Sequence, residues 1–306
     1  MDKIISCDWG TSNFRLRLVV RNTREVLQEV VKKTGTASTH KKWKSQGLDE
    51  SQRIPFYTTI LSNSLQQFNT EFNDDFPIII SGMASSSIGM MEIPYQTFPF
   101  TWNINQLAVK KVESRALGHP IFLVSGFKTD NDVMRGEETI LFGCEVDEAD
   151  SVFIFPGTHS KHVFVKNKTA FNFKTYTTGE LFNLLLKYSV LRNSTSRGED
   201  EAAFTEGILQ GAEGNILHEL FMVRTRNLLQ QKDRVNSYQF LSGILIGAEL
   251  SSFKEENADI YIVTAGRLKA PYMKAAELLK ISKNISWINS DKALINGHCK
   301  IAHHIS

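Results

Sequence analysis

The chain has 306 residues, of which 42% are hydrophobic and 22% are charged, and its formal net charge is +2. This composition is typical of a globular protein with a large buried core, and so small a charge argues against nucleic acid or an anionic membrane as the main partner. The length suits one large domain or two lobes of about 150 residues each.

The cysteines and the apolar runs bear on the cellular compartment. Cys7, Cys144 and Cys299 are widely spaced and odd in number, and no CxxC pair occurs. A disulfide framework or a zinc site is therefore not expected, whereas a reducing cytoplasm is. The sequence starts without the apolar core of a signal peptide and has no apolar run of about 18 residues. We expect a cytoplasmic protein without a membrane segment.

The first third of the chain predicts an antiparallel meander of three strands, then a helix and a buried strand. The first strand is a short apolar run, and the second alternates apolar residues with arginines. Apolar residues at helical spacing predict the helix, and Gly82 ends the buried strand. The expected elements cover, in order, residues 3–8, 14–20, 25–31, 54–72 and 77–81.

The second half repeats this order, with more helices before its buried strand. Its strands are expected at residues 151–155, through Val163 and Val165, at 169–174, at 260–264 and at 284–288. Its helices are expected at residues 179–190, 201–230, 237–253, 269–280 and 291–303. An α/β fold built from a duplicated unit follows from this repetition.

The duplication sets the expected domains. The acidic stretch from Glu145 to Asp150 contains a boundary near residues 146–150, with an N-terminal lobe over residues 1–147 and a C-terminal lobe over 148–306. A Gly-Thr turn follows the first strand of each unit, at Gly10-Thr11 and at Gly157-Thr158. Two related lobes that face each other would place these turns across one cleft, where they could clamp a phosphate chain.

The turn after the first strand is the first candidate site. Asp8 ends the strand, and Gly10, Thr11, Ser12 and Asn13 follow. Glycine lets the backbone approach a ligand, and successive N–H groups in a tight turn form a nest for anions. An acid at this point can hold Mg²⁺, usually through water. The alternative is an ordinary hairpin turn with a capping aspartate.

Two further turns are candidates on the same grounds. Gly157, Thr158 and Lys161 again offer a glycine, a hydroxyl and a cation, although a plain turn would look the same. Thr264 and Gly266 follow a buried strand, where small residues let a flat ring lie against the backbone. A tight strand-to-helix connection is the alternative there.

The acids of residues 130–139 form the fourth candidate site. A carboxylate at the mouth of a helix can accept the proton of a substrate hydroxyl, and phosphoryl transfer needs one such base besides positioning and charge. Arg135 could grip a substrate carboxylate with both arms of its guanidinium. The alternative is an acidic helix N-terminus stabilised by the helix dipole. No GxxxxGK[ST], GxGxxG, HExxH or GxSxG occurs, so a P-loop, a dinucleotide-binding loop, a zinc protease and a serine hydrolase are not supported.

These segments, in this order, resemble those of the 2-dehydro-3-deoxygalactonokinases. The resemblance runs from residue 8 to residue 266, and its most specific parts are MRGEET and PGTHSK. The matching segments are DWGTSN (8–13), SGM (81–83), VMRGEET (133–139), FPGTHSK (155–161), TGEL (178–181), LSGILIGAE (241–249) and TAG (264–266).

The resemblance implies a duplicated ribonuclease H-like fold, that of the actin-like ATPases, with two lobes around a nucleotide cleft. The N-terminal lobe would contact the sugar acid and phosphate, and the C-terminal lobe phosphate and adenosine. The reaction implied is ATP- and Mg²⁺-dependent phosphorylation of 2-dehydro-3-deoxy-D-galactonate at its 6-hydroxyl, in D-galactonate breakdown.

The resemblance also implies roles for individual residues. Asp8 would hold the metal and take part in catalysis, Glu137 would be the base, with Asp130 or Asp132 as alternatives, and Arg135 would bind substrate. In the related glycerol kinases the base is an aspartate before a helix, and this chain has residues 136–138 in its place. The expected cofactor-binding residues are Gly10, Thr11, Ser12, Asn13, Gly157, Thr158, Lys161 and Gly266. The expected substrate-binding residues are Gly82, Met83, Ser85, Ser86, Asp130 and Arg135.

Two other functions stay open at this stage. The chain could phosphorylate a different small sugar or keto acid with the same fold, or it could be a nucleotide-binding regulator without catalysis. The sequence does not decide between the galactonate-derived substrate and its gluconate-derived epimer. A homodimer is expected from the general frequency of symmetric dimers.

Overall fold

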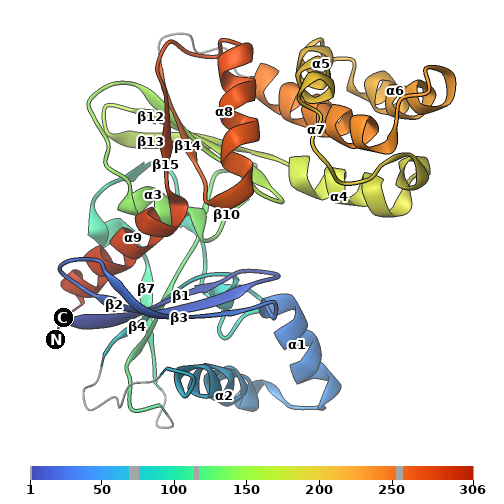
Figure 1. Cartoon of the computed structure of the whole chain (residues 1–306). Coiled ribbons are helices and arrows are strands. Elements are labelled where there is room, and N and C mark those ends of the chain that lie inside the picture. The colour runs from blue at the N-terminus through green and yellow to red at the C-terminus, as the bar shows by residue number, and fades with distance from the viewer. Residues whose placement is uncertain (1, 69–75, 114–116, 253–257, 306) are drawn as a thin grey trace. The chain divides into compact units, whose positions relative to one another are not determined.

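A computed structural model describes residues 2–68, 76–113, 117–252 and 258–305 (Figure 1). The chain divides into two compact units, and each is described by itself. Unit 1 comprises Met1–Asp147 together with Ser290–Ser306, and unit 2 comprises Glu148–Asn289.

The centre of unit 1 is a six-stranded mixed sheet in the order β3-β2-β1-β4-β8-β7. The first three strands form the expected antiparallel meander, β4 and β8 run parallel to β1, and β7 is antiparallel to β8. The strands are β1 Lys3–Trp9, β2 Phe14–Val20, β3 Val26–Lys32, β4 Ile78–Gly82, β7 Val109–Val112 and β8 Ile121–Val124.

Helices and short strands surround this sheet. Helix α2 was expected over residues 54–72 and ends at Leu65, while residues 69–72 lie outside the described residues. Three short strands form a second sheet in the order β10-β9-β5. The bounds are α1 Thr36–Ser45, η1 Glu50–Gln52, α2 Arg53–Leu65, η2 Met83–Ser85, β5 Gln96–Thr97, β6 Phe100–Thr101, η3 Ile104–Gln106, β9 Phe127–Lys128, β10 Val133–Met134 and α3 Glu137–Gly143.

The last helix, α9 (Ser290–His304), belongs to unit 1. Its Asp291 carboxylate forms ion pairs with Arg15 (2.5 Å) and Arg17 (3.0 Å) of β2. The Asn296 side chain donates to the Gly143 carbonyl at the end of α3. This differs from the sequence-based domains, which placed residues 148–306 in one lobe, because these contacts hold residues 290–306 to the first unit.

One side chain of α9 joins two strands of the sheet. The imidazole of His298 lies 2.7 Å from the Ser6 hydroxyl of β1 and 3.1 Å from the Ser81 hydroxyl of β4. Burial, and to a smaller extent the charge of Arg17, lowers the pKa of His298 to about 3. The ring is therefore neutral and connects the middle of β1 to the end of β4.

Unit 2 repeats the strand order of unit 1. Its strands follow the order β13-β12-β11-β14-β15, with an antiparallel meander and with β14 and β15 parallel to β11. The predicted duplication is thus confirmed at the level of topology. The strands are β11 Ser151–Phe155, β12 Ser160–Lys166, β13 Thr169–Tyr176, β14 Asp259–Val263 and β15 Ile285–Ile288.

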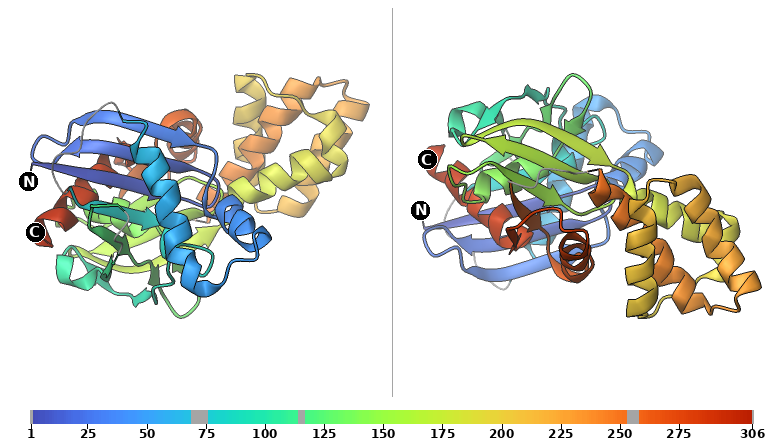
Figure 2. Two further views of the ribbon diagram at one scale, coloured as in Figure 1. Left: turned by 90° about the horizontal axis from the view of Figure 1, so that it is seen from below. Right: turned by 90° about the horizontal axis from the view of Figure 1, so that it is seen from above.

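The helices between β13 and β14 gather in a group of their own beside the sheet of this unit (Figure 2). The single helix expected over residues 201–230 is two helices, because the chain turns at Gly214, whose φ is 86°. No helix within the described ranges is long and apolar enough to cross a membrane. The helices between β13 and β14 are α4 Thr178–Tyr188, η4 Val190–Ser194, α5 Glu201–Ala212, α6 Ile216–Leu229 and α7 Arg234–Ser251. Two more follow β14, namely η5 Gly266–Leu268 and α8 Lys269–Leu278.

Helices α5 and α7 touch backbone to backbone along four glycines. Gly207 and Gly211 of α5 face Gly243 and Gly247 of α7, and a Cβ at any of them would lie 2.1 to 2.3 Å from a carbonyl oxygen of the opposite helix. No side chain fits at such a distance. The contact therefore fixes the position of α7, which carries a buried glutamate, Glu249, directly after this seam.

Candidate active site

The first Gly-Thr turn joins β1 to β2 and is held from behind by the start of α1. The N–H groups of residues 35–37 donate to the carbonyls of Gly10, Thr11 and Ser12 over 2.9 to 3.1 Å. A Cβ at Gly35 would lie 2.3 Å from the Thr11 carbonyl oxygen, so the helix can start this close only with glycine. The turn carbonyls thus point to α1, and the side chains of residues 11–13 are exposed.

The second Gly-Thr turn joins β11 to β12 and is held in the same way by the start of α4. The Glu180 N–H donates to the Thr158 carbonyl over 2.9 Å, and a Cβ at Gly179 would lie 2.3 Å from the Gly157 carbonyl oxygen. Thr158 is exposed, and a Cβ at Gly157 would meet no described atom within 4 Å. The Lys161 ammonium donates to the carbonyl of His159, which keeps this cation at the turn.

In unit 1 the ends of β1 and β4 meet the start of α3. Gly82 has a φ of 87°, and Gly136, which precedes α3, has a φ of 112°, conformations that side chains rarely adopt. A Cβ at Gly82 would lie 3.6 Å from Oδ1 of Asp8, and a Cβ at Gly136 would lie 3.3 Å from the Cα of Gly82. The structure therefore brings the predicted residues Asp8 and Gly82 together with the segment that carries Glu137.

The electrostatics of Asp8 also connect these segments. Burial raises the pKa of Asp8, the charges of Arg15 and Arg17 lower it, and the charges of Asp291 and Glu137 raise it again. Glu137 is half-buried, and its Oε2 accepts the backbone N–H of Arg135 over 3.2 Å. A cation bound here would relieve the repulsion between Asp8 and Glu137.

Glu138 is one of the acids of residues 130–139, and the sequence interpretation gave it no role of its own. Its side chain is fully buried, accepts the Gly136 N–H over 2.6 Å and contacts the Thr139 hydroxyl at 3.0 Å. Burial, followed by the charge of Glu137, raises its pKa to about 8. Two consecutive glutamates at a helix start look alike in a sequence, and only packing shows which of them is neutral.

The Arg135 guanidinium binds the loop that begins at Gly82. It donates to both oxygens of Ser85, each at 2.6 Å, and to the Ile93 carbonyl at 3.2 Å. It also lies 4.2 Å from the ring centre of Tyr95. The arms expected to grip a substrate carboxylate therefore contact the protein itself, and Arg135 orders the loop with Met83, Ser85 and Ser86.

The other two predicted acids lie in the hairpin turn between β9 and β10. The Asp132 carboxylate accepts the Val133 N–H over 2.8 Å, and its carbonyl accepts the Thr129 N–H over 2.9 Å. Asp130 is exposed at the tip of this turn. Asp132 thus stabilises the hairpin, whereas Glu137 is the acid of residues 130–139 that acts on the pKa of Asp8.

The expected adenosine segment follows β14 in unit 2. Gly266 has a φ of 70°, and a Cβ there would meet no described atom within 4 Å. The indole N–H of Trp287 donates to the Thr264 carbonyl over 2.9 Å, and the Lys269 ammonium lies 3.6 Å from the centre of the indole. Trp287 is partly exposed and was not expected here, because the sequence does not show that β15 pairs with β14.

Comparison with solved structures and a family model gives the class of protein. Component A of (R)-2-hydroxyglutaryl-CoA dehydratase from Acidaminococcus fermentans matches over 99% of each chain with a TM-score of 0.51 at 9% identity. Together with the duplicated sheet, this likeness confirms the predicted fold, which is the actin-like ATPase fold. The model of the 2-keto-3-deoxy-galactonokinase family matches residues 8–301. The chain belongs to this family, as its sequence had indicated, and is a kinase that uses ATP.

Individual relatives agree along nearly the whole length. The 2-dehydro-3-deoxygalactonokinase of Escherichia coli K12 is 29% identical over 99% of each chain. A candidate 2-dehydro-3-deoxygalactonokinase of Rhizobium meliloti is 28% identical over 95% of this chain and 93% of its own. The crystal structure of a candidate 2-dehydro-3-deoxygalactonokinase from Sinorhizobium meliloti, 26% identical, matches 99% of each chain with a TM-score of 0.83.

The Glu138→Gln variant should change how stability depends on pH. The folded protein keeps the Glu138 proton up to pH about 8, whereas the unfolded chain loses it near the ordinary pKa of 4.5. Between these values the folded state binds more protons, so its stability falls as pH rises, by up to about 1.4 kcal/mol per pH unit. The variant has no proton to lose at this position, so its stability does not fall in this way. Its free energy of unfolding should therefore rise relative to that of wild type as the pH increases from 5 to 8.

Urea unfolding at several pH values measures this difference. Glu25→Gln, at an exposed position, is the matched control and should follow the wild-type pH dependence. If Glu138→Gln also ran parallel to wild type, Glu138 would not be a neutral buried acid.

Proposed function

We propose that this chain transfers the γ-phosphoryl group of ATP to the 6-hydroxyl of 2-dehydro-3-deoxy-D-galactonate. The products are 2-dehydro-3-deoxy-6-phospho-D-galactonate and ADP, and the pathway is the breakdown of D-galactonate. The observation that carries this proposal is the family match over residues 8–301. Two structural features support it. Each unit has a Gly-Thr turn, and unit 1 has an aspartate near the end of its first strand.

The phosphates of ATP bind to the two Gly-Thr turns. In unit 1 the carbonyls of residues 10–12 accept N–H groups at the start of α1, and the hydroxyls of Thr11 and Ser12 are exposed, so the turn can donate to anionic oxygens. In unit 2 Gly157 and Thr158 offer the same groups, with the Lys161 ammonium beside them. The adenosine lies against Gly266, where the backbone is open.

Asp8 would hold Mg²⁺, which would supply positive charge to the phosphate oxygens. The residues present fit this ion, because Mg²⁺ is ordinarily bound by one or two carboxylates together with phosphates and water. No cluster of three or more His, Cys, Asp or Glu that could hold a metal occurs in the described parts of the chain. A single carboxylate at the end of β1 suits a cation that shares its ligands with a nucleotide.

Glu137 accepts the proton of the 6-hydroxyl. It is half-buried, and its charge acts on Asp8. It follows Gly136, whose backbone lies next to Gly82. The loop that begins there, with Met83, Ser85 and Ser86, binds the sugar acid, and Arg135 orders this loop. Asp130 and Asp132 remain the alternative bases, and Asp130 remains a predicted substrate contact.

The compartment and the oligomeric state belong to the same proposal. Cys7, Cys144 and Cys299 are buried free thiols, which supports a reducing cytoplasm. The homodimer stays a prediction from general frequency.

A panel of acceptors tests the reaction. We expect ADP release that depends on 2-dehydro-3-deoxy-D-galactonate, followed by a coupled assay, and a phosphomonoester at C6 by phosphorus NMR. The panel includes the gluconate-derived epimer, other sugar and keto acids, and a reaction without acceptor. Turnover with another acid alone would make the chain a different kinase of this fold. ATP binding without any acceptor-dependent ADP release would make it a regulator.

The Glu137→Gln variant tests the base. The amide keeps the size of the side chain and an oxygen for the Arg135 N–H, but it cannot take a proton. We expect kcat to fall by about 10²- to 10⁴-fold with little change in the KM for ATP. Glu145→Gln, at an exposed position soon after α3, is the matched control. Near-full turnover of Glu137→Gln, with a loss in Asp130→Asn or Asp132→Asn, would move the role to one of those acids.

A further inference from the structure

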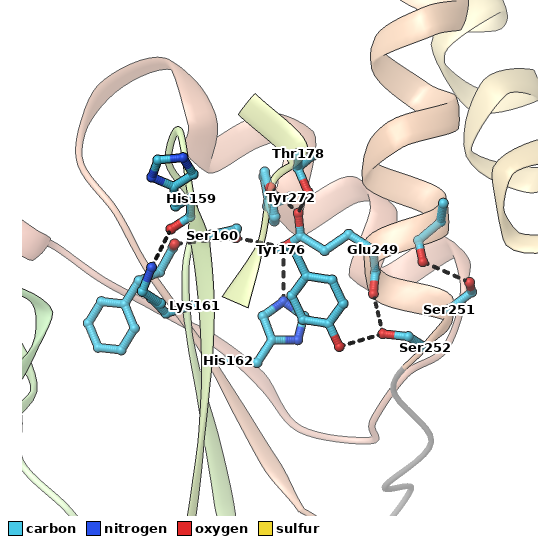
Figure 3. Close-up of polar contacts among 12 residues, drawn as sticks. His159, Ser160, Lys161, His162, Tyr176, Thr178, Glu249, Ser251, Ser252 and Tyr272 are labelled. Carbon is cyan, nitrogen blue, oxygen red and sulfur yellow. Dashed lines mark hydrogen bonds and ion pairs between the residues drawn. The ribbon is translucent and has the colours of Figure 1, made fainter. Parts of the chain in front are cut away.

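Glu249 of α7 is a buried carboxylate behind the second Gly-Thr turn, where four side chains converge on it (Figure 3). The Ser160 hydroxyl donates to it over 2.6 Å, the Tyr272 hydroxyl over 2.7 Å and the His162 Nε2 over 2.9 Å. The Thr178 hydroxyl donates to it as well. These donors come from β12, α4 and α8, so a single carboxylate joins three elements to α7.

The network keeps Glu249 ionised. Burial alone would raise the pKa of Glu249, but the hydrogen bond and charge of His162 and the hydrogen bonds of Ser160 and Thr178 lower it below its usual value. Burial and the charge of Glu249 raise the pKa of Tyr272 far above its usual value, so Tyr272 keeps its proton and donates. The acceptor is a full negative charge with matched donors on both oxygens.

Two of the donors lie on the two sides of the Gly157-Thr158 turn. Ser160 is the first residue of β12, directly after the turn. Thr178 is the first residue of α4, next to Gly179, whose backbone packs on the turn. The Glu249 carboxylate therefore holds both segments that set the shape of the turn, although it does not belong to the turn itself.

Unit 1 orders its turn by other means. There, three successive N–H groups at the start of α1 bind the turn carbonyls, and the Thr36 hydroxyl also donates to Gly10. In unit 2 the Glu180 N–H binds the turn, and the carboxylate ties its two flanks. A buried charge is costly compared with apolar packing of the same size, so its value lies in fixing one geometry rather than in stability alone.

We propose that Glu249 is a positioning residue for the nucleotide: it holds the Gly157-Thr158 turn, through Ser160 and Thr178, in the shape that binds the phosphates of ATP. This inference rests on the proposed function, since it presupposes that the turn binds ATP. Glu249 itself touches no substrate. Its loss must therefore weaken nucleotide binding before it affects the sugar acid, whose proposed site lies in unit 1.

Glu249→Gln is the direct test. The amide places N–H groups where hydroxyl donors now point, so part of the network is lost at almost unchanged volume. We expect the Kd of ATP, measured by calorimetry on the full chain without acceptor, to rise about tenfold or more, as for lost hydrogen bonds to a charged group. The KM for ATP should rise alike, while the acceptor KM and kcat at saturating ATP change less than about threefold. Glu277→Gln, at an exposed position of α8, is the charge-matched control.

A second pair of variants separates positioning from general stability and covers the case that Glu249→Gln fails to fold. Thr178→Val removes the donor beside the turn, and Tyr272→Phe removes the donor of α8. We expect Thr178→Val to weaken ATP binding severalfold and Tyr272→Phe to bind ATP like wild type, even if both unfold at lower temperature. Equal weakening by both variants would overturn the inference, because a purely structural cluster would behave in that way.

The outcomes also distinguish this inference from the proposed function. If wild type binds ATP and folded Glu249→Gln or Thr178→Val binds it equally well, the inference is overturned and the kinase proposal stands. If wild type binds no ATP, the proposed function fails, and the inference fails with it.

Discussion

The close contact between each Gly-Thr turn and the helix behind it is the constraint on which the proposed nucleotide chemistry depends. Gly35 lies against Thr11 in unit 1, and Gly179 lies against Gly157 in unit 2, each so close that a Cβ would be 2.3 Å from a carbonyl oxygen. The helix N–H groups use the turn carbonyls, and the hydroxyls of Thr11 and Thr158 stay exposed. A carbonyl-lined turn would repel phosphate, whereas this arrangement leaves donors available.

Both units contain a Gly-Thr turn packed against a helix, but they differ in the charged side chains around that turn. Unit 1 brings the acidic end of β1 to the start of α3, where the charge of Glu137 raises the pKa of Asp8 and Glu138 is buried and neutral. Unit 2 adds a buried carboxylate, Glu249, on a helix that a glycine seam holds in place. The acids that could accept a proton or bind a cation, Asp8 and Glu137, thus lie in unit 1. The carboxylate that orders the segments beside a turn, Glu249, lies in unit 2. This division suits a kinase in which unit 1 supplies the acids and unit 2 supplies an ordered turn.

Much of this arrangement could be predicted from local patterns, and the rest depends on distant contacts. The meanders, the two turns and the strand before Gly266 follow from period and turn chemistry, and the family resemblance was confirmed by the match over residues 8–301. Strands β7 and β8 have four residues each, too few for a clear periodicity. The return of α9 to unit 1 depends on ion pairs of Asp291 with residues of β2, far away in the sequence. The sequence identified Arg135 as important, but its partners, Ser85 and Ile93, are set by tertiary packing.

The central claim is that the Gly-Thr turn of each unit binds ATP, and the ATP affinity of Thr11→Val and Thr158→Val measures it most directly. Both residues are exposed, and valine keeps the shape of threonine while it removes the hydroxyl. The account predicts that each variant, titrated with ATP and Mg²⁺ by calorimetry, binds roughly tenfold more weakly than wild type while it unfolds at the wild-type temperature. Wild-type affinity in either variant would contradict the account, because the hydroxyl of that turn would then make no contact with ATP.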